Sequence, residues 1–167
     1  MDYRKILKET PNKKNLSVTL KKSPEKGVGL FATKTIKKGD TIAYYKIQIF
    51  LERTYESPTD FVYSFEVYRK NGQKYQRLIG DIYDGSFPLP ENDIPFWGAF
   101  VNEPSENGRT NADIEIDLEN NYKDRNFSVP GETMIYKLIA TRKIQPKEEI
   151  LWYYGKNYKR DYKVGKH

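Results

Sequence analysis

The most informative part of this sequence is ATRKIQPKEEILWYYG, residues 140–155. It overlaps the end of an apolar, strand-like run over 134–142 and contains a turn at 146–149, where a proline interrupts regular structure. Three consecutive aromatic side chains, residues 152–154, then precede a glycine. The pattern predicts a strand, a turn and an aromatic segment, followed by a short terminal helix over 155–162.

Short strand-like patterns recur through the rest of the chain. Apolar and polar residues alternate in several places, and turns rich in Gly, Pro, Asn and Asp separate these runs. An Asn-Gly pair at 71–72 is a strong hairpin signal. In DIEID, residues 113–117, the alternation predicts isoleucines facing inward and acids outward. We expect a mostly β fold with little helix and with strands at 16–20, 30–36, 41–50, 61–68, 75–82, 113–117 and 134–142.

The composition indicates one soluble domain and excludes several kinds of chemistry. A chain of 167 residues can bury a core without metals or disulfides. The absence of Cys excludes disulfides, thiol nucleophiles and Cys-based zinc sites, and a single His excludes His triads, so we expect no metal. No apolar run approaches the roughly 20 residues that span a bilayer, and the charged start is unlike a signal peptide. The sequence therefore predicts an intracellular protein without a membrane partner.

The net charge of +6 is unevenly distributed. Residues 1–26 carry eight Lys or Arg against three Asp or Glu, and residues 156–167 carry five against one, so the region between them has a net charge of −3. Within it, residues 81–119 hold ten acidic side chains and one basic one. An acidic face suits a basic peptide, whereas the basic ends suit solubilising tails or phosphate contacts. A solvent-exposed acidic surface that binds no partner explains these charges equally well.

The segment SPEKGVGLFAT, residues 23–33, leads into a second glycine turn at 36–42. A Gly-x-Gly pair alone indicates only a tight turn. Together with the Leu-Phe-Ala-Thr that follows, however, the segment closely resembles the opening of a SET domain, which is found in protein lysine methyltransferases. In that family the glycine turn lets the backbone approach the methionine part of S-adenosylmethionine. The resemblance implies a cofactor site formed by Lys26, Gly27, Val28 and Gly29.

The segment WGAFVNE, residues 97–103, resembles the SET signature in which an Asn-His pair is followed by Pro-Asn. The resemblance implies that Phe100, Asn102 and Glu103 bind the cofactor and that Asn111 has a mainly structural role. Glu103 stands where the family has His, and the connection to Asn111 is longer than usual. The divergent PR branch of the family also lacks this His and has a similar Trp-x-x-Phe-Val-Asn run.

The closing stretch at 140–155 resembles the end of a SET domain, where a Gly-Glu-Glu-Leu turn leads to an aromatic residue, Asp, Tyr and Gly. The resemblance implies that Tyr154 is the catalytic tyrosine and also borders the cofactor. Tyr153 replaces the usual Asp, as in the PR branch, and Trp152 occupies the position that limits the number of methyl groups added. Tyr45 ends a TIAYY run that resembles the strand lining the lysine channel, which implies a second catalytic residue.

These segments occur in family order, so the resemblance implies a domain organisation. It comprises a basic segment at 1–15, a SET domain over 16–155 with a variable insert at about 46–96, and a basic segment at 156–167. The implied fold has several small sheets, little helix and a knot-like C-terminal segment.

The resemblance also implies an activity, the S-adenosylmethionine-dependent methylation of a lysine in a protein substrate. Many members close the lysine channel with a Cys-rich zinc segment, which this chain lacks, so we expect Tyr158 and Tyr162 to supply that wall. A basic peptide, most simply a histone tail, is expected to contact Trp152 and Tyr158 and the acidic surface around Asp113, Glu115 and Asp117.

Two other classes of function remain open from the sequence. A catalytically inactive SET/PR-like interaction module is supported by Glu103 and Tyr153. A small basic nucleic-acid binder is supported by the charged ends, but the acidic interior argues against it and against sequence-specific contact. A short SET domain that lacks flanking segments is also a candidate for a homodimer. Histone methylation would place the protein in a nucleus, its own or a host cell's, and a non-histone substrate would allow the cytoplasm.

Overall fold

The structure, a computed structural model, describes residues 2–24, 26–57, 60, 62–67, 78–82, 93–117 and 130–167. Strands dominate the regular structure of these residues, and the helical elements are short, which confirms the mostly β prediction. The elements in chain order are α1 (Tyr3–Glu9), η1 (Lys13–Asn15), β1 (Val18–Ser23), β2 (Gly27–Ala32), β3 (Thr41–Leu51), η2 (Glu52–Thr54), β4 (Phe65–Val67), β5 (Leu78–Asp81), η3 (Gly98–Phe100), β6 (Ala112–Ile116) and β7 (Thr133–Ala140). No helix in the described ranges is long and apolar enough to cross a membrane.

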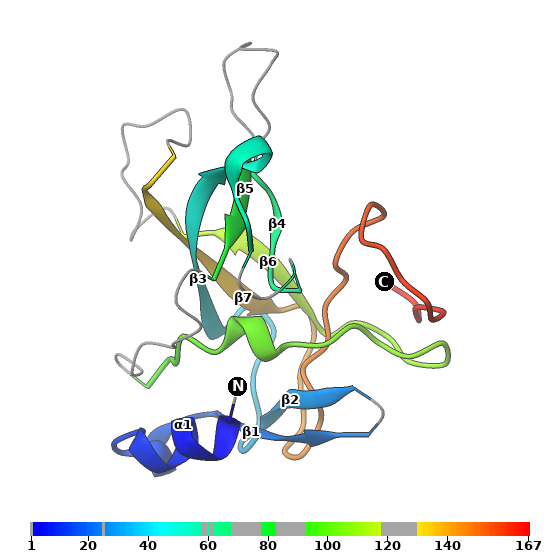
Figure 1. Ribbon diagram of the computed structural model, residues 1–167. Helices are drawn as coiled ribbons and strands as arrows, with labels where there is room; N and C mark the ends of the chain where they lie inside the picture. The colour runs from blue at the N-terminus through cyan, green and yellow to red at the C-terminus, as the bar shows by residue number, and fades with distance from the viewer. Residues whose placement is uncertain are drawn as a thin grey trace.

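The described strands form two antiparallel sheets (Figure 1). β1 and β2 make a hairpin in which Val18 pairs with Ala32 and Ser23 with Gly27. The second sheet has the order β4-β5-β3-β7-β6, with β3 pairing with both β5 and β7. The inward positions of β3 hold β-branched and aromatic side chains that suit a pleated, half-buried surface. β3 is therefore the structural centre of the larger sheet.

Two clusters of buried side chains hold the sheets together. The larger cluster joins the β1–β2 hairpin to β7 and η3, and it contains the fully buried Trp97 together with Leu30 and Leu138. The smaller one packs Ile47 and Ile49 of β3 against neighbouring strands. Burying one such aliphatic side chain contributes about 1.5–3 kcal/mol. The hairpin and the region around η3 are thus fixed to each other by core packing.

The segment that follows β7 passes between distant parts of the chain. Ile144 exchanges backbone hydrogen bonds with Ile36, and the amide of Ile150 donates to the carbonyl of Leu30 in β2 (2.7 Å). Two residues later the amide of Trp152 donates to the carbonyl of Asn102 (3.0 Å). The segment therefore lies between the hairpin and the chain that follows η3, which confirms the expected knot-like arrangement.

Two features near the ends of the chain differ from the sequence predictions. The expected helix over 155–162 is wrong, because Gly155 has a positive φ of 93° and this region contains only turns and bends. Conversely, α1 was not predicted, although Asp2 accepts a hydrogen bond from the amide of Arg4 as an N-cap. α1 packs on the larger core cluster through Tyr3, Ile6 and Leu7.

The alternation over 113–117 holds for only part of the segment. Asp113 and Glu115 are exposed and Ile114 is half-buried, as predicted. Beyond these the prediction is wrong, because Ile116 is 43% exposed and Asp117 is only 2% exposed. β6 ends at Ile116, so the period of two no longer applies to Asp117, whose amide donates to the carbonyl of Ile135 instead (3.0 Å). Asp117 therefore does not contribute to an acidic surface.

The predicted hairpin is confirmed by the antiparallel pairing of β4 with β5, and its Asn-Gly turn lies outside the described residues. The strand predicted at 30–36 begins earlier, at Gly27, and ends at Ala32. Both glycines of the first SET-like segment, Gly27 and Gly29, therefore lie on β2.

Candidate active site

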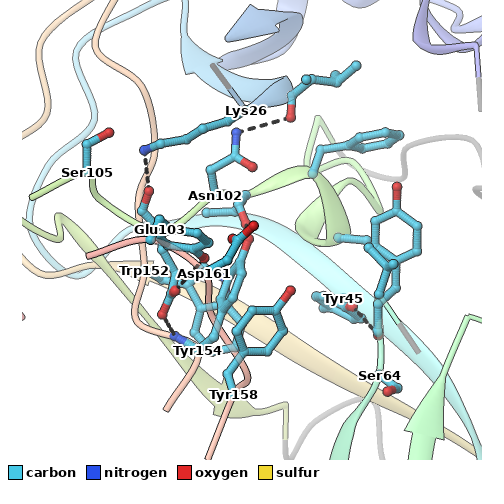
Figure 2. A pocket seen from close by; sticks show the side chains of 18 of the residues that line it. Lys26, Tyr45, Ser64, Asn102, Glu103, Ser105, Trp152, Tyr154, Tyr158 and Asp161 are labelled. Atoms are coloured by element: carbon cyan, nitrogen blue, oxygen red, sulfur yellow. Dashed lines mark hydrogen bonds between the residues drawn. The ribbon is translucent and has the colours of Figure 1, made fainter. Parts of the chain in front are cut away.

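A cavity of about 930 Å³ opens between the β1–β2 hairpin, η3 with the residues after it, and the C-terminal residues (Figure 2). Its size is within the usual range for a small-molecule site. Most residues that the sequence predicted for the site line this one cavity, although they come from distant segments. They are Lys26, Gly27, Val28, Tyr45, Phe100, Asn102, Glu103, Trp152, Tyr154, Tyr158 and Tyr162.

One side of the cavity, the glycine wall, consists of Lys26, Gly27, Val28 and Asn102. Nδ2 of Asn102 donates to the carbonyl of Val28 (3.1 Å) and to Oε1 of Glu149 (2.9 Å). These bonds fix the amide of Asn102 relative to the strand edge. The amine of Lys26 donates to the carbonyl of Glu103, which ties the tip of the hairpin to the same region.

Gly29 stands directly behind the glycine wall. A Cβ atom there would lie 2.4 Å from Oε1 of Glu149 and 3.0 Å from Nδ2 of Asn102. A side chain at this position would therefore displace the carboxylate of Glu149 and press on the amide of Asn102, so glycine allows the close approach without any shift. Gly29 therefore supports the wall from behind, and the cavity lining does not include it.

A second part of the lining, the tyrosine wall, consists of Tyr45, Trp152, Tyr154 and Tyr158. The ring of Tyr154 contacts Trp152 edge-on at 5.4 Å and Tyr158 at 4.8 Å between centroids. Its hydroxyl donates to the carbonyl of Val101 (2.7 Å). The hydroxyl of Tyr45 donates to the carbonyl of Tyr63 (2.6 Å). Figure 2 shows Tyr154 and Tyr158 close together, with Tyr45 of β3 to one side of them.

Burial strongly affects the hydroxyls of the tyrosine wall. Loss of solvent raises the pKa of Tyr154 far above its usual value of 10.0, with smaller contributions from Tyr162 and Tyr158. The pKa of Tyr45 is also raised well above 10.0 by burial, and next by the neighbouring Tyr154. Both phenols are therefore protonated at neutral and moderately alkaline pH. They offer neutral hydroxyls and aromatic faces but no negative charge.

Glu103, where the family has His, is the centre of a buried network. Its side chain is 1% exposed and receives hydrogen bonds from Nε of Arg160 (2.7 Å), the amide of Tyr154 (2.7 Å) and the hydroxyl of Tyr162 (2.8 Å). Arg160 also donates to the carbonyls of Tyr158 (2.9 Å) and Gly155 (2.7 Å). One carboxylate thus positions the C-terminal residues that close the cavity.

The charge of Glu103 is compensated within this network. Burial by itself raises the pKa of the carboxyl, but the hydrogen bonds from Arg160, from the amide of Tyr154 and from Tyr162 outweigh it, and the net pKa is lowered. The guanidinium of Arg160 also lies over the rings of Tyr153 (5.1 Å) and Tyr158 (5.4 Å). Glu103 is therefore ionised at neutral pH, and its carboxylate faces the C-terminal segment.

Charged side chains line the mouth of the cavity. Glu106 and Asp161 are exposed there, and Glu106 pairs with Lys163 at 3.0 Å. The sequence had suggested Asp113 and Glu115 for contact with a basic substrate. Those two acids lie on the exposed face of β6 and are not part of the cavity lining, and Glu115 pairs with Lys137 (3.2 Å).

Asn111, the second Asn of the SET-like signature, is buried beside the site. Its Nδ2 donates to the carbonyl of Glu149 (2.8 Å), and its Oδ1 accepts from the amide of Leu151 (2.8 Å). Both bonds hold the segment that passes behind the cavity. This geometry is that of a structural residue.

Several residues of the site were not singled out from the sequence. Arg160 and Glu106 occur in charged stretches that give no sign of a buried or converging role. Tyr63 lies in the predicted variable insert, yet it lines the cavity and accepts the Tyr45 hydroxyl. The described residues contain no group of three or more His, Asp or Glu side chains that could hold a metal ion.

The family model of the SET domain matches residues 27–155. No curated protein sequence matches the chain. The solved structures described next are at most 21% identical to it, so their similarity concerns the fold.

Three of these structures are representative. A candidate histone methyltransferase from Plasmodium falciparum superposes with a TM-score of 0.52 at 21% identity, covering 86% of this chain and 96% of that one. ATXR5, solved with histone H3.1, superposes with a TM-score of 0.55 at 17% identity. The match covers 95% of this chain and 64% of the ATXR5 chain. KRYPTONITE, solved with mCHG DNA and SAH, superposes with a TM-score of 0.50 at 17% identity. The match covers 84% of this chain and 24% of the KRYPTONITE chain.

Proposed function

Because the chain belongs to the SET domain family of protein methyltransferases, we propose that it transfers a methyl group from S-adenosylmethionine to a lysine side chain of a protein substrate, with a histone tail as the favoured substrate. The observation that carries the proposal is one cavity with two unlike walls. The glycine wall presents strand backbone and a fixed amide, and the tyrosine wall presents buried neutral phenols. These surfaces suit two different ligands.

The glycine wall fits S-adenosylmethionine. The close approach at Gly29, where a Cβ would collide with Asn102 and Glu149, leaves main-chain groups of the hairpin beside the cavity. Such groups and the amide of Asn102 can hold the amino-acid part of the cofactor, with Lys26 and Phe100 completing the lining. When bound, S-adenosylmethionine supplies an electrophilic methyl group on a sulfonium. The aromatic faces nearby stabilise a cation of this kind.

The tyrosine wall fits the aliphatic stem and amine of a lysine. A free lysine has a pKa of about 10.4, so deprotonating it near neutral pH costs roughly 4 kcal/mol. A channel lined by Tyr45, Tyr154 and Tyr158 excludes water and thereby disfavours the ammonium form. The fixed ring of Tyr154 would orient the amine, and alignment of this kind supplies much of the acceleration in a one-step transfer. Trp152 would limit the space for added methyl groups.

The cavity mouth supports a basic peptide as the substrate. Asp161 is exposed at the entrance and favours the approach of a positively charged chain, whereas Lys163 compensates the charge of Glu106 there. On β6, outside the cavity lining, Asp113 is exposed and Glu115 pairs with Lys137. A histone tail has the required charge, and the similar fold of ATXR5 was solved with histone H3.1. Methylation of histones would take place in a nucleus.

The test is transfer of labelled methyl groups from S-adenosylmethionine to core histones, together with the cofactor affinity measured by calorimetry. Label on one histone, located on one lysine by mass spectrometry, is the expected result. Binding of the cofactor without transfer to histones would contradict the histone assignment and keep the enzyme class. Absence of both binding and transfer would contradict the proposal and favour the inactive interaction module, which Glu103 and Tyr153 support.

A further inference from the structure

One end of the molecule carries a strong positive charge that the proposed reaction does not use. This basic end consists of residues 2–21, 33–40 and 141–148, and it holds twelve Lys or Arg side chains and four Asp or Glu. All twelve basic side chains are exposed. The net charge of the whole chain is +6, so the basic end alone, at +8, exceeds it. The remaining residues are therefore net acidic.

The three segments of the basic end share one surface. A second hollow, of about 350 Å³, is lined by residues from all of them, including Lys13, Lys21 and Lys147. Backbone hydrogen bonds join the segments directly, since the amide of Thr33 donates to the carbonyl of Ser17 (2.8 Å) and other bonds link 33–40 to 141–148. Figure 1 shows α1 and the β1–β2 hairpin at this end, with the orange 141–148 turn beside the hairpin.

The four acids of the basic end already have local partners. Each interacts with a group of the same segment, so none is directed toward a cationic ligand. The contacts are Asp2 with the amide of Arg4 (3.0 Å), Glu9 with Lys5 (4.0 Å), Asp40 with the amide of Lys37 (3.0 Å) and Glu148 with Arg142 (2.8 Å). After these contacts the surface keeps its excess of eight positive charges.

The surface lacks the features of a membrane anchor. Among the described residues the exposed large hydrophobic side chains are Val62, Ile116 and Tyr162, and all three lie outside the basic end. Membrane binding by a basic surface normally requires apolar side chains or a lipid as a second anchor. A large number of exposed cations spread over three segments matches instead an extended, regularly charged polyanion.

We propose that the basic end binds the phosphate backbone of duplex DNA without reading its sequence. Lys13, Lys21 and Lys147, which converge on the hollow, are the central contacts. The hollow and the cavity are close together, because Trp97 lines the hollow while Ala99 and Phe100 of η3 line the cavity. The docking of nucleosomal DNA there would bring a histone tail to the cavity, and this second step rests on the proposed function.

The first test measures the binding of a fluorescent 20-base-pair duplex by anisotropy over a series of salt concentrations. Each lost phosphate contact lowers the steepness of log K against log salt by about 1. The triple variant Lys13→Ala, Lys21→Ala, Lys147→Ala should therefore lose about 3 from this slope. A matched triple variant, Lys46→Ala, Arg109→Ala, Lys166→Ala, removes three exposed charges elsewhere and should keep the wild-type slope within about 1.

Three outcomes would overturn the inference. They are no salt-dependent binding by the wild-type protein, equal slopes in the two triple variants, and equally strong binding of a polyglutamate peptide of the same charge. The last would identify an acidic protein as the partner. Circular dichroism of both variants checks that each is folded, and all six positions are exposed.

The second test compares methyl transfer to nucleosomes and to a free histone tail peptide. The variant at Lys13, Lys21 and Lys147 should raise KM for nucleosomes at least tenfold and leave kcat/KM for the peptide within twofold. A parallel loss on both substrates would contradict DNA docking. The DNA-binding test does not require any transfer, so a failure of the proposed function and a failure of this inference can be told apart.

Discussion

The two walls of the cavity are built in different ways. The glycine wall belongs to the β1–β2 hairpin and to Asn102, and it is held by backbone pairing and by close packing at Gly29. The tyrosine wall depends on C-terminal residues that have no regular secondary structure, and these are held by side-chain bonds to Glu103. Main-chain geometry therefore determines one wall, and a single buried ion pair stabilises much of the other.

This difference has a consequence for substitutions. A wall made from paired backbone fails when atoms are added, because a dense strand edge has no space for them. A wall held by one ion pair fails when a partner is removed, because a buried charge is left without compensation. The two walls should therefore respond to opposite kinds of change.

The largest expected effect is that of Arg160→Ala. It leaves the carboxylate of Glu103 buried and unpaired, which should lower the free energy of unfolding by about 3 kcal/mol. The matched control is Arg142→Ala, which breaks the exposed pair with Glu148, where the two side chains are 47% and 32% exposed. That change should cost at most about 1 kcal/mol. Equal losses in urea denaturation would show that Glu103 does not hold the C-terminal segment.

The next effect concerns the glycine wall. Gly29→Ala places a Cβ against Glu149 and Asn102, which must shift, and the Kd of S-adenosylmethionine should rise at least tenfold. Gly131→Ala is the control, because Gly131 has a positive φ of 88° and no atom lies within 4 Å of the position that a Cβ would take. Gly131→Ala should lower the free energy of unfolding and leave the Kd of S-adenosylmethionine unchanged. An unchanged Kd of S-adenosylmethionine in Gly29→Ala would show that the glycine wall does not bind the cofactor.

A smaller effect is expected in the pH dependence of stability. The pKa of Glu103 in the folded protein is lowered below the ordinary value of 4.5, so the unfolded chain takes up the proton first as pH falls. The contribution of Glu103 is therefore complete above about pH 4.5 and is lost as the pH falls through the lowered pKa. Glu103→Gln should lack this component in denaturation curves recorded between pH 3 and 7. If the stability of wild type and of Glu103→Gln depended on pH in the same way, the network would not stabilise the ionised carboxylate of Glu103.

The smallest expected effect is an absence of change at alkaline pH. Burial raises the pKa values of Tyr45 and Tyr154 above 10.0, so the neutral phenols persist as the pH rises from 7 to 10. The value of kcat/KM should rise with deprotonation of the substrate lysine and show no decline caused by tyrosine ionisation. A descending limb with an apparent pKa near 10.0 would show that one of these phenols is solvated.

Local patterns predicted much of the fold. Strand-like runs bounded by turn residues located β3 and β7, and the Asn-Gly pair correctly indicated that β4 and β5 form a hairpin. The terminal helix was wrong because Arg160 bonds to the carbonyls of Gly155 and Tyr158 and directs this segment toward Glu103. Tertiary contacts override local propensity in such cases.

The candidate site was predictable where it resembled known motifs. Gly27, Asn102 and Tyr154 were named from the sequence and line the same cavity. The link between Glu103 and Arg160 was not predictable, because the two residues are 57 positions apart and each occurs in an ordinary charged context. Long-range pairs of this kind leave no periodic signal in one sequence.

The most direct test of the two-wall account is the comparison of wild type with Tyr154→Phe. The change removes only the hydroxyl that donates to Val101 and leaves the glycine wall intact. We expect kcat for methyl transfer to fall about 100-fold, as for loss of one positioned polar group in an active site, with the Kd of S-adenosylmethionine unchanged within twofold. Full turnover in Tyr154→Phe, or loss of cofactor binding with no separate effect on turnover, would contradict the assignment of the tyrosine wall to the lysine.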